Sequence, residues 1–98
     1  MSGDRREFPH MLGSRPRSIE AAFGVALRRL RLAAGLSQES LALEAGIQRN
    51  FVSLIELGRN QPTIATIAKV AGALGMTASA LVAEAEAELP AARARPKK

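Results

Sequence analysis

The sequence predicts an all-α fold of five short helices. Hydrophobic residues make up 47% of the 98 residues but aromatic ones only 3%, and alanine and leucine are abundant. Strands favour β-branched and aromatic side chains, so this composition favours helices. Apolar residues also recur at intervals of three and four between glycine and proline stops, the period of a helix that buries one side. A chain of this length is expected to form one domain with a single core.

The first two predicted helices are bounded by serines and glycines. Ser18 is a cap for a helix that ends at Gly35. Ser37 caps a second helix of about two turns, which Gly46 ends. Their apolar faces consist of Ile19, Ala22, Phe23, Ala26, Leu27, Leu30 and Ala34 in the first helix and Leu41, Ala42 and Ala45 in the second.

Three further helices follow the same punctuation. The third lies in the stretch GIQRNFVSLIELGRNQPT, residues 46–63, and stops at Gly58. A fourth begins after a Thr63 cap and stops at Gly75. The fifth begins at Thr77 or Ala78 and continues towards Leu89, with an apolar stripe at helical spacing.

The positive charge of the chain is concentrated at its ends. Its net charge is +5. Residues 1–18 hold four basic and two acidic side chains, and residues 90–98 hold four basic ones, which leaves −1 for residues 19–89. We therefore expect a flexible tail over residues 1–17, a folded domain over 18–89 and a basic tail over 90–98. Arginines dominate residues 28–59 and glutamates the end of the domain, so one side should be electropositive.

Several classes of function are not supported. Cysteine is absent, the first residues lack the apolar core of a signal peptide, and no apolar run reaches the length of a membrane span, so we expect a soluble, cytoplasmic protein without disulfides. His10 is the sole histidine and falls in a predicted tail. We expect no enzyme activity, metal, cofactor or small-molecule ligand, because no ligand cluster, phosphate loop or activated nucleophile is present.

The third helix carries an unusual group of polar residues. At about 100° per residue, one side gathers the residues expected in the core, Gln48, Phe51, Val52 and Ile55. The opposite side gathers Arg49, Asn50 and Ser53, with Leu54 at its margin. In a DNA major groove, arginine can bridge the two acceptors of guanine, asparagine can pair with adenine, and an apolar side chain can touch the thymine methyl.

The same residues are also compatible with an ordinary solvated surface, because helix starts favour asparagine and serine. The turn that precedes these residues favours the DNA-contact interpretation. Two short helices joined through Gly46 and Ile47 form a tight helix-turn-helix, which directs its second helix outward. Helical hairpins are also common in proteins that never bind DNA, so the residues alone leave both interpretations open.

Residues 27–76 resemble the helix-turn-helix domain of the lambda repressor and Cro superfamily, the XRE-like regulators. The motifs that carry the resemblance are LSQ at 36–38, LA at 41–42, AG at 45–46, SLIE at 53–56, Gly58, Pro62 and AGALG at 71–75. Within that superfamily the run IQRNFVSLIELGRNQPTI is most similar to the controller proteins of restriction-modification systems. The resemblance implies a compact five-helix, lambda-repressor-like fold and double-stranded DNA as the partner.

The resemblance also implies roles for individual residues. Arg49 and Asn50 match the main base-reading positions of the family, and Ser53 and Leu54 match the next helical turn. Gln38 corresponds to a glutamine that bonds a DNA phosphate and supports the recognition helix, and Arg59, Asn60 and Thr63 lie where relatives hold the DNA backbone. Arg31 and Glu56 correspond to a salt bridge between the first and third helices. Phe51 either packs in the core or approaches the DNA backbone, and packing is the preferred interpretation. Arg28 and Arg29 are weaker phosphate candidates.

The apolar stripe of the fifth helix suggests a dimer. Its residues are Leu81, Val82, Ala85 and Leu89. An exposed stripe indicates a partner, and the last helix of this family often builds a two-fold dimer that places two recognition helices about 34 Å apart. The alternative is that the stripe packs back on the first helix.

These observations predict a homodimeric transcriptional regulator that reads an inverted-repeat operator, as a repressor or a controller-type autoregulator. An antitoxin that represses its own operon is an alternative of the same class. A helical adaptor that binds proteins and no specific DNA sequence is an alternative of a different class.

Overall fold

The computed structural model describes residues 16–90, and five α-helices make up most of that stretch. They are α3 (Ile19–Ala33), α4 (Gln38–Ala45), α5 (Arg49–Glu56), α6 (Ile64–Ala73) and α7 (Ala78–Ala87). No strand occurs within residues 16–90, and the predicted all-α fold of five helices is confirmed. Nearly all of the predicted tails, together with His10, lies outside the described residues.

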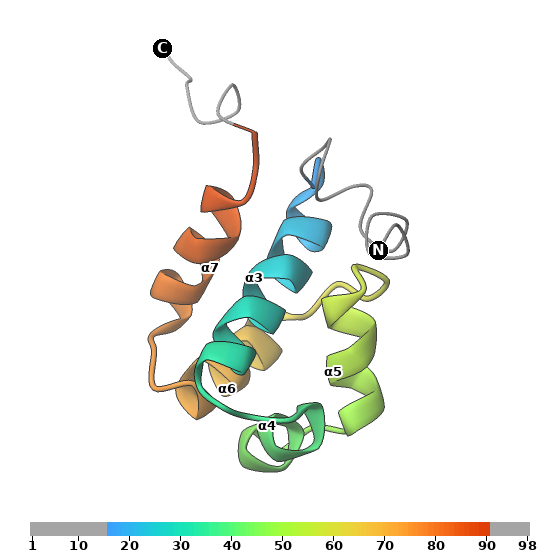
Figure 1. The fold of residues 1–98 in the computed structure, drawn as a ribbon, viewed down its shortest axis with the longest axis vertical. Coiled ribbons are helices and arrows are strands. Elements are labelled where there is room, and N and C mark those ends of the chain that lie inside the picture. The colour runs from blue at the N-terminus through green and yellow to red at the C-terminus, as the bar shows by residue number, and fades with distance from the viewer. Residues whose placement is uncertain (1–15, 91–98) are drawn as a thin grey trace, which may run out of the picture.

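The helices are arranged around α3, the longest of them (Figure 1). α7 packs along one side of α3 and α5 lies on its other side, while α4 and α6 close the end at which α3 finishes. All five helices supply the shared core, whose buried members are Phe23, Ala26, Leu27, Leu41, Ala42, Ala45, Val52, Ile55, Val70, Ala71, Leu81 and Ala85.

The predicted starts of four helices are confirmed by capping bonds. Hydroxyl oxygens at four N-termini each accept a backbone N–H at 2.9 to 3.1 Å, and they belong to Ser18, Ser37, Thr63 and Thr77. Gly46 and Gly58 bracket α5, each with a φ of 74°, a left-handed conformation that other residues rarely adopt. Both ends of the predicted recognition helix are therefore fixed by local backbone geometry.

α3 and α5 approach each other closely at Gly24. A Cβ added to Gly24 would meet the carbonyl oxygen of Ile55 and lie 2.6 Å from that of Glu56. The backbone of α5 thus rests directly against α3 with no space for a side chain between them. Glycine in a helix interior lowers helix stability, and here the close packing of two helices accounts for it.

Three apolar or amide positions differ from the sequence-based expectation. Gln48 is exposed and precedes α5 as its N-cap residue, so it does not lie on the core side of that helix. Ile19, at the first turn of α3, is 41% exposed. Leu89 follows the end of α7, because the helix stops at Ala87. All three lie at helix ends, where regular helical spacing no longer predicts the direction of a side chain.

The apolar stripe of α7 is largely used inside the chain. Leu81 and Ala85 are completely buried in the core, whereas Val82 and Leu89 are half-buried. A residue buried in its own chain offers no surface to a second copy, so the expectation that Leu81 and Ala85 form a dimer interface is wrong. α5 leaves one side of α3 uncovered, and α7 covers it, which is the alternative that the sequence left open.

No single helix of the described stretch is long and apolar enough to cross a membrane. α6 and α7 reach that length only as a pair, and the pair is bent by 96°. Both helices contribute fully buried side chains to the core, namely Val70 and Ala71 from α6 and Leu81 and Ala85 from α7.

Candidate nucleic-acid interface

α4 and α5 form the helix-turn-helix, with residues 46–48 as the turn. The N–H of Ile47 donates to the carbonyl of Ala42 at 3.0 Å across the left-handed Gly46, which closes the end of α4. The side chain of Ile47 packs against the core and anchors the turn. α5 therefore leaves the turn with Val52 and Ile55 completely buried and with its opposite side facing outward.

A buried polar network fixes the far end of α5. The guanidinium of Arg31 donates to both carboxylate oxygens of Glu56, at 2.6 Å from Nε and 3.1 Å from Nη2. The two side chains are only 6% and 3% exposed, and the ion pair that the resemblance implied is present. A bidentate pair of this kind fixes geometry as well as contributing energy.

The network extends to the start of α4. Arg31 also donates from Nη1 to the carbonyl of Leu36 at 2.8 Å. Gln38 donates from Nε2 to Glu56 Oε1 at 3.0 Å, so the amide of α4 is tied directly to the last residue of α5. Through these bonds α3, the turn after it, α4 and α5 hold one another in a fixed arrangement, as expected for a buried charge whose hydrogen-bonding groups are satisfied.

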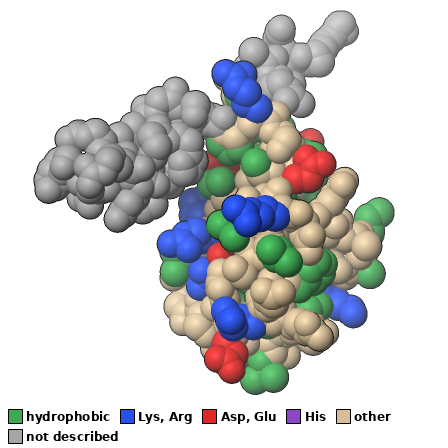
Figure 2. Space-filling model, turned by 90° about the vertical axis from the view of Figure 1, so that its right-hand side faces the viewer, with side chains coloured by type: hydrophobic (Ala, Val, Ile, Leu, Met, Phe, Trp, Pro, Cys, Tyr) green, Lys and Arg blue, Asp and Glu red, His purple; other side chains and the backbone are tan. Residues whose placement is uncertain are grey.

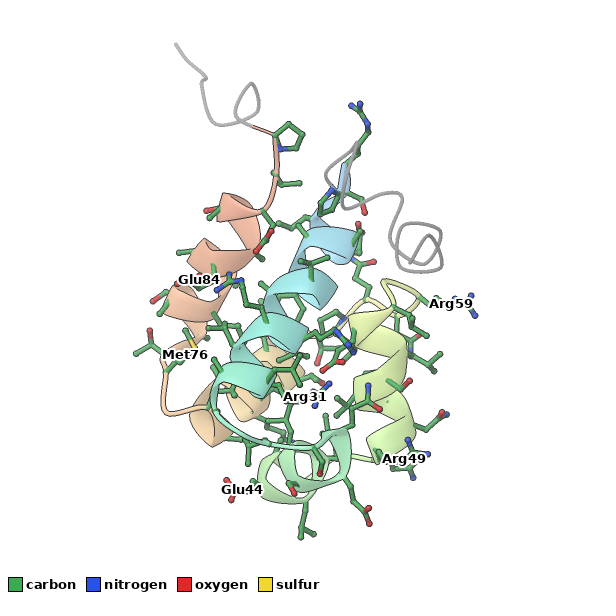
Figure 3. The ribbon with its side chains drawn as sticks, viewed as in Figure 1. Arg31, Glu44, Arg49, Arg59, Met76 and Glu84 are labelled. Atoms are coloured by element: carbon green, nitrogen blue, oxygen red, sulfur yellow. The ribbon has the colours of Figure 1, made fainter. Side chains whose placement is uncertain are left out.

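The predicted base-reading residues lie on the outward side of α5. Arg49 and Asn50 are exposed, and Ser53 and Leu54 are partly exposed. Arg49 projects away from the body of the molecule at the start of α5, and Arg59 does so just beyond its other end (Figure 3). The outward side of this one short helix therefore carries a guanidinium, a carboxamide, a hydroxyl and an apolar group.

The predicted phosphate-binding residues surround this helix but differ in what else they do. Arg59 is exposed and Asn60 partly exposed in the loop after α5. The hydroxyl of Thr63 accepts the N–H of Thr66 at 3.1 Å and donates to the hydroxyl of Thr66 at 3.1 Å. Thr63 is therefore first a cap of α6. Gln38 uses one Nε2 hydrogen in the bond to Glu56, which leaves its second N–H and its carbonyl oxygen.

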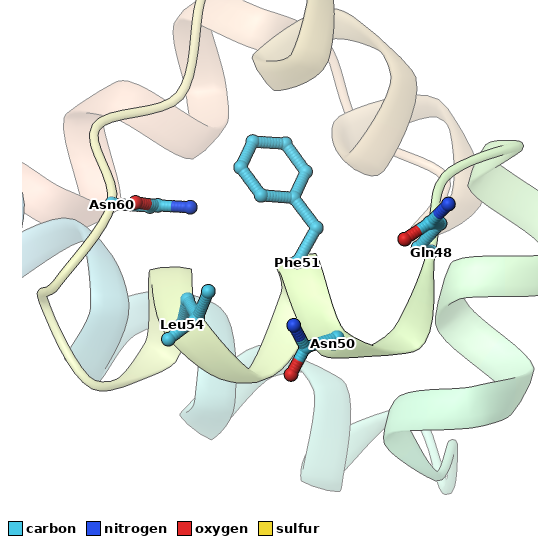
Figure 4. A pocket seen from close by; sticks show the side chains of 5 residues that line it. All are labelled: Gln48, Asn50, Phe51, Leu54 and Asn60. Carbon is cyan, nitrogen blue, oxygen red and sulfur yellow. The ribbon is translucent and has the colours of Figure 1, made fainter.

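An open hollow of about 320 Å³ lies on the outward side of α5, beside the loop that follows this helix. Its lining residues are Gln48, Asn50, Phe51, Leu54 and Asn60. Phe51 stands at the centre of this group, with Gln48 on one side and Asn60 on the other (Figure 4). Phe51 is half-buried and packs against the core, so its ring contacts the core and also borders the hollow.

Two residues of this region were missed by the sequence analysis. Gln48 was assigned to the core, although a residue that caps a helix has non-helical backbone angles and does not follow the helical wheel. Gly24, which holds α5 against α3, received no role. An isolated glycine inside a helical pattern is the signal that could have identified a close packing contact.

The face of the molecule that carries α5 is moderately basic. Lys and Arg side chains outnumber Asp and Glu side chains on the face that carries α5, and they are dispersed among neutral ones (Figure 2). Residues 16–90 contain seven basic and seven acidic side chains, so the described domain has no net charge. Arg29 is not available for a phosphate, because it donates to Glu84 at 2.9 Å and to Glu88 at 3.1 Å on the α7 side of the molecule.

A second hollow, of about 150 Å³, is mainly apolar and lies between α3, α6 and α7. Its lining residues are Ile19, Glu20, Phe23, Gln61, Pro62, Ile67, Val82 and Ala85. Within residues 16–90 no group of three or more His, Asp or Glu side chains is arranged to hold a metal ion.

The sequence and the fold were compared with those of known proteins. A family model described as Helix-turn-helix (HTH_3) matches residues 27–81. Control protein C.MunI from Mycoplasma sp is 35% identical over 71 residues, which cover 71% of this chain and 96% of C.MunI. The immunity repressor protein of Bacillus phage phi105 is 38% identical over 61 residues, but they cover 62% of this chain and only 42% of the repressor.

A solved structure has the same fold. The restriction-modification controller protein C.AhdI from Aeromonas hydrophila matches with a TM-score of 0.61 and 41% identity. The match covers 62% of this chain and 92% of C.AhdI. This chain therefore aligns with nearly the whole length of C.AhdI but with less than half the length of the phage repressor.

Proposed function

Because the chain belongs to the helix-turn-helix family HTH_3 of DNA-binding transcriptional regulators and is close to restriction-modification controller proteins, we propose that it reads a specific inverted-repeat operator as a homodimer. This family is not a class of enzymes. The observation that carries the proposal is the outward side of α5, where Arg49, Asn50, Ser53 and Leu54 are presented by a helix whose position is fixed.

α5 is the recognition helix and lies in the major groove. Arg49 bridges the two acceptors of a guanine, and Asn50 contacts an adenine, because these pairings match donor and acceptor geometry at the groove edge. Ser53 and Leu54 extend the contact by one helical turn. The Arg31–Glu56 pair contributes by keeping α5 in place, so Arg31 is a positioning residue and not a phosphate ligand.

Contacts to the DNA backbone come from both sides of α5. Gln38 donates its second Nε2 hydrogen to a phosphate while the first holds Glu56, and Arg59 and Asn60 hold the strand at the other end of the helix. Thr63 supports α6, whose N-terminus follows this loop. Such contacts set the register of the protein on DNA but do not select bases.

The short length of α5 supports a homodimer. One helix of eight residues reads only a few base pairs, and a two-fold dimer doubles the site and produces an inverted repeat. The apolar hollow bordered by Ile19 and Val82 is the surface that supports this assembly, because α7 leaves Val82 partly exposed there. Ile19, at the first turn of α3, lines the same hollow and is 41% exposed.

The dimer is tested by charge substitution. Ile19→Asp should convert the protein to particles of 10.4 kDa, while the control Leu43→Asp should leave the dimer intact, since Leu43 is 81% exposed on α4 and does not line this hollow. Sedimentation velocity at micromolar concentration measures both. Monomers in the unmodified protein, free and on operator DNA, would contradict the proposal.

The proposal as a whole is tested by selection of bound duplexes from a random DNA pool at about 150 mM salt, where nonspecific attraction is screened. A two-fold symmetric motif is expected. Arg49→Ala should cost about 1 to 3 kcal/mol on that motif and relax the choice at one base pair per half-site. The control Arg28→Ala removes an exposed arginine from α3 and should leave the motif unchanged. Recovery of no motif would support the adaptor alternative instead.

The controller-type role is favoured over the antitoxin role by the similarity to C.MunI and C.AhdI. A controller acts on the promoter of its own operon, so the selected motif should occur upstream of the gene for this chain. Neighbouring restriction and methylase genes would agree with that role, and a neighbouring toxin gene would contradict it.

A further inference from the structure

The hollow on the reading side of α5 combines an apolar wall with an amide rim. Phe51 and Leu54 supply apolar surface, and Gln48, Asn50 and Asn60 supply carboxamides around it (Figure 4). None of the five lining residues carries a charge. A carboxamide can bond a phosphate oxygen, as proposed for Asn60, but a hollow without a cationic side chain holds a phosphate less strongly than one that has it.

The chemistry of the hollow matches one kind of base-pair edge. In the major groove an A·T pair presents the thymine 5-methyl group beside the thymine O4 acceptor and the N6 and N7 atoms of adenine. A G·C pair presents no methyl group, and its guanine acceptors suit the cationic fork of an arginine better than a carboxamide. An apolar wall with an amide rim therefore complements A·T.

The wall is held in place by the rest of the fold. Phe51 is half-buried against the core, and α5 is fixed at its far end by the Arg31–Glu56 pair. Leu54 is partly exposed, lines the hollow and is not among the residues packed on the core. The Phe51 side of the wall is therefore prearranged and gains contact with a methyl group without first having to order its side chain.

We propose that this hollow reads an A·T pair in each half-site by packing the thymine 5-methyl group against Phe51 and Leu54. The inference rests on the proposed DNA-binding function and names the base pair that this part of the site selects. The amides of Gln48 and Asn50 face the same pair and its neighbour, where they bond adenine.

The test replaces thymine by deoxyuridine, which deletes the methyl group and leaves every hydrogen-bonding atom unchanged. Each thymine of the selected motif is replaced singly, and affinity of the unmodified protein is measured by fluorescence anisotropy. One position per half-site should weaken binding about fourfold, the equivalent of one buried methyl group. The other thymines should show no change.

Two variants locate the methyl contact. In Leu54→Ala the deoxyuridine effect at that position should shrink or vanish, because part of the apolar wall is gone. In Leu43→Ala, a matched change on α4 outside the hollow, the effect should persist in full. Circular dichroism verifies that both variants are folded.

The outcomes distinguish a failure of the methyl-reading hollow from a failure of the proposed DNA-binding function. A selected motif with no thymine that responds to deoxyuridine, or a response that Leu54→Ala leaves intact, would overturn the methyl-reading hollow and leave the regulator proposal standing. Failure to select any motif would overturn the proposed function itself.

Discussion

Arg29 and Arg31 stand two residues apart on α3 and illustrate two different uses of one side chain. Arg31 faces α5, where it is almost fully buried and holds Glu56 through two bonds. Arg29 faces α7 and bridges Glu84 and Glu88 with its side chain 47% exposed (Figure 3 labels Arg31 and Glu84). The Arg31 pair supports α5 from inside, and the Arg29 pairs join α3 and α7 at the surface.

The difference lies in what replaces the interaction when it is lost. At the surface, water solvates a released carboxylate, so an exposed pair contributes little. In the interior, removing one partner leaves a charge without solvent or counter-charge, and the cost becomes several kilocalories per mole. The α3–α5 side should therefore be sensitive to substitution and the α3–α7 surface tolerant.

Arg31→Ala should have the largest effect. We expect a loss of about 3 to 5 kcal/mol in the free energy of unfolding, because Glu56 stays buried without its partner. Urea unfolding followed by circular dichroism measures the loss. The double change Arg31→Met with Glu56→Leu should recover much of the stability, and a double variant as unstable as the single one would show that shape rather than charge decides.

Gly24→Ala should come next. Its Cβ would press on the carbonyl groups of Ile55 and Glu56, so we expect about 1 to 3 kcal/mol of destabilisation from overpacking. Gly72→Ala is the matched control, because a Cβ at Gly72 on α6 meets nothing within 4 Å. That change should stabilise the domain by up to about 1 kcal/mol. Equal tolerance at the two positions would contradict the close α3–α5 contact.

Glu84→Ala should be nearly silent. Removal of this exposed partner of Arg29 is expected to cost at most about 1 kcal/mol, and the cost should decrease further when the salt concentration is raised. The same urea titration at low and high salt provides the measurement. A cost as large as that of Arg31→Ala would remove the contrast between the two sides.

The smallest expected effect concerns pH. The pKa of Arg29 is raised, mainly by the hydrogen bond to Glu84. Partial desolvation lowers this pKa, and the interaction with Glu88 raises it further. A raised pKa adds stability below the ordinary value for arginine, and that stability is lost only as pH rises through the still higher folded value. The difference in unfolding free energy between Arg29→Ala and the unmodified protein should therefore stay constant from about pH 6 to about pH 9. A steady change across that range would contradict it.

Local signals in the sequence predicted most of the fold. Serine and threonine caps and glycine stops are decided by the few residues around them, which explains why Ser37, Thr63 and Gly58 were assigned correctly. The Arg31–Glu56 pair joins residues 25 positions apart, and the resemblance to a family supplied it.

The misassigned residues depend on which helix is the neighbour. The wheel gives the direction of Leu81 and Ala85 but not the identity of the surface that they meet, which is α3 of the same chain. Glu84 and Glu88 repel each other in an isolated helix, whereas here Arg29 lies between them. Helical periodicity predicted which residues lie on the outward side of α5. It could not predict the hollow around Phe51, because Asn60 from the following loop also lines that hollow.

The burial pattern of α5 separates folding from recognition. Val52, Ile55 and Glu56 hold the helix in the domain, while Arg49 and Asn50 make no contribution to the buried core. If α5 reads DNA as proposed, substitutions on its outward side alter the preferred operator while the scaffold stays stable. A gene duplicate of this protein could acquire a new target promoter through a few surface changes, without passing through an unfolded ancestor.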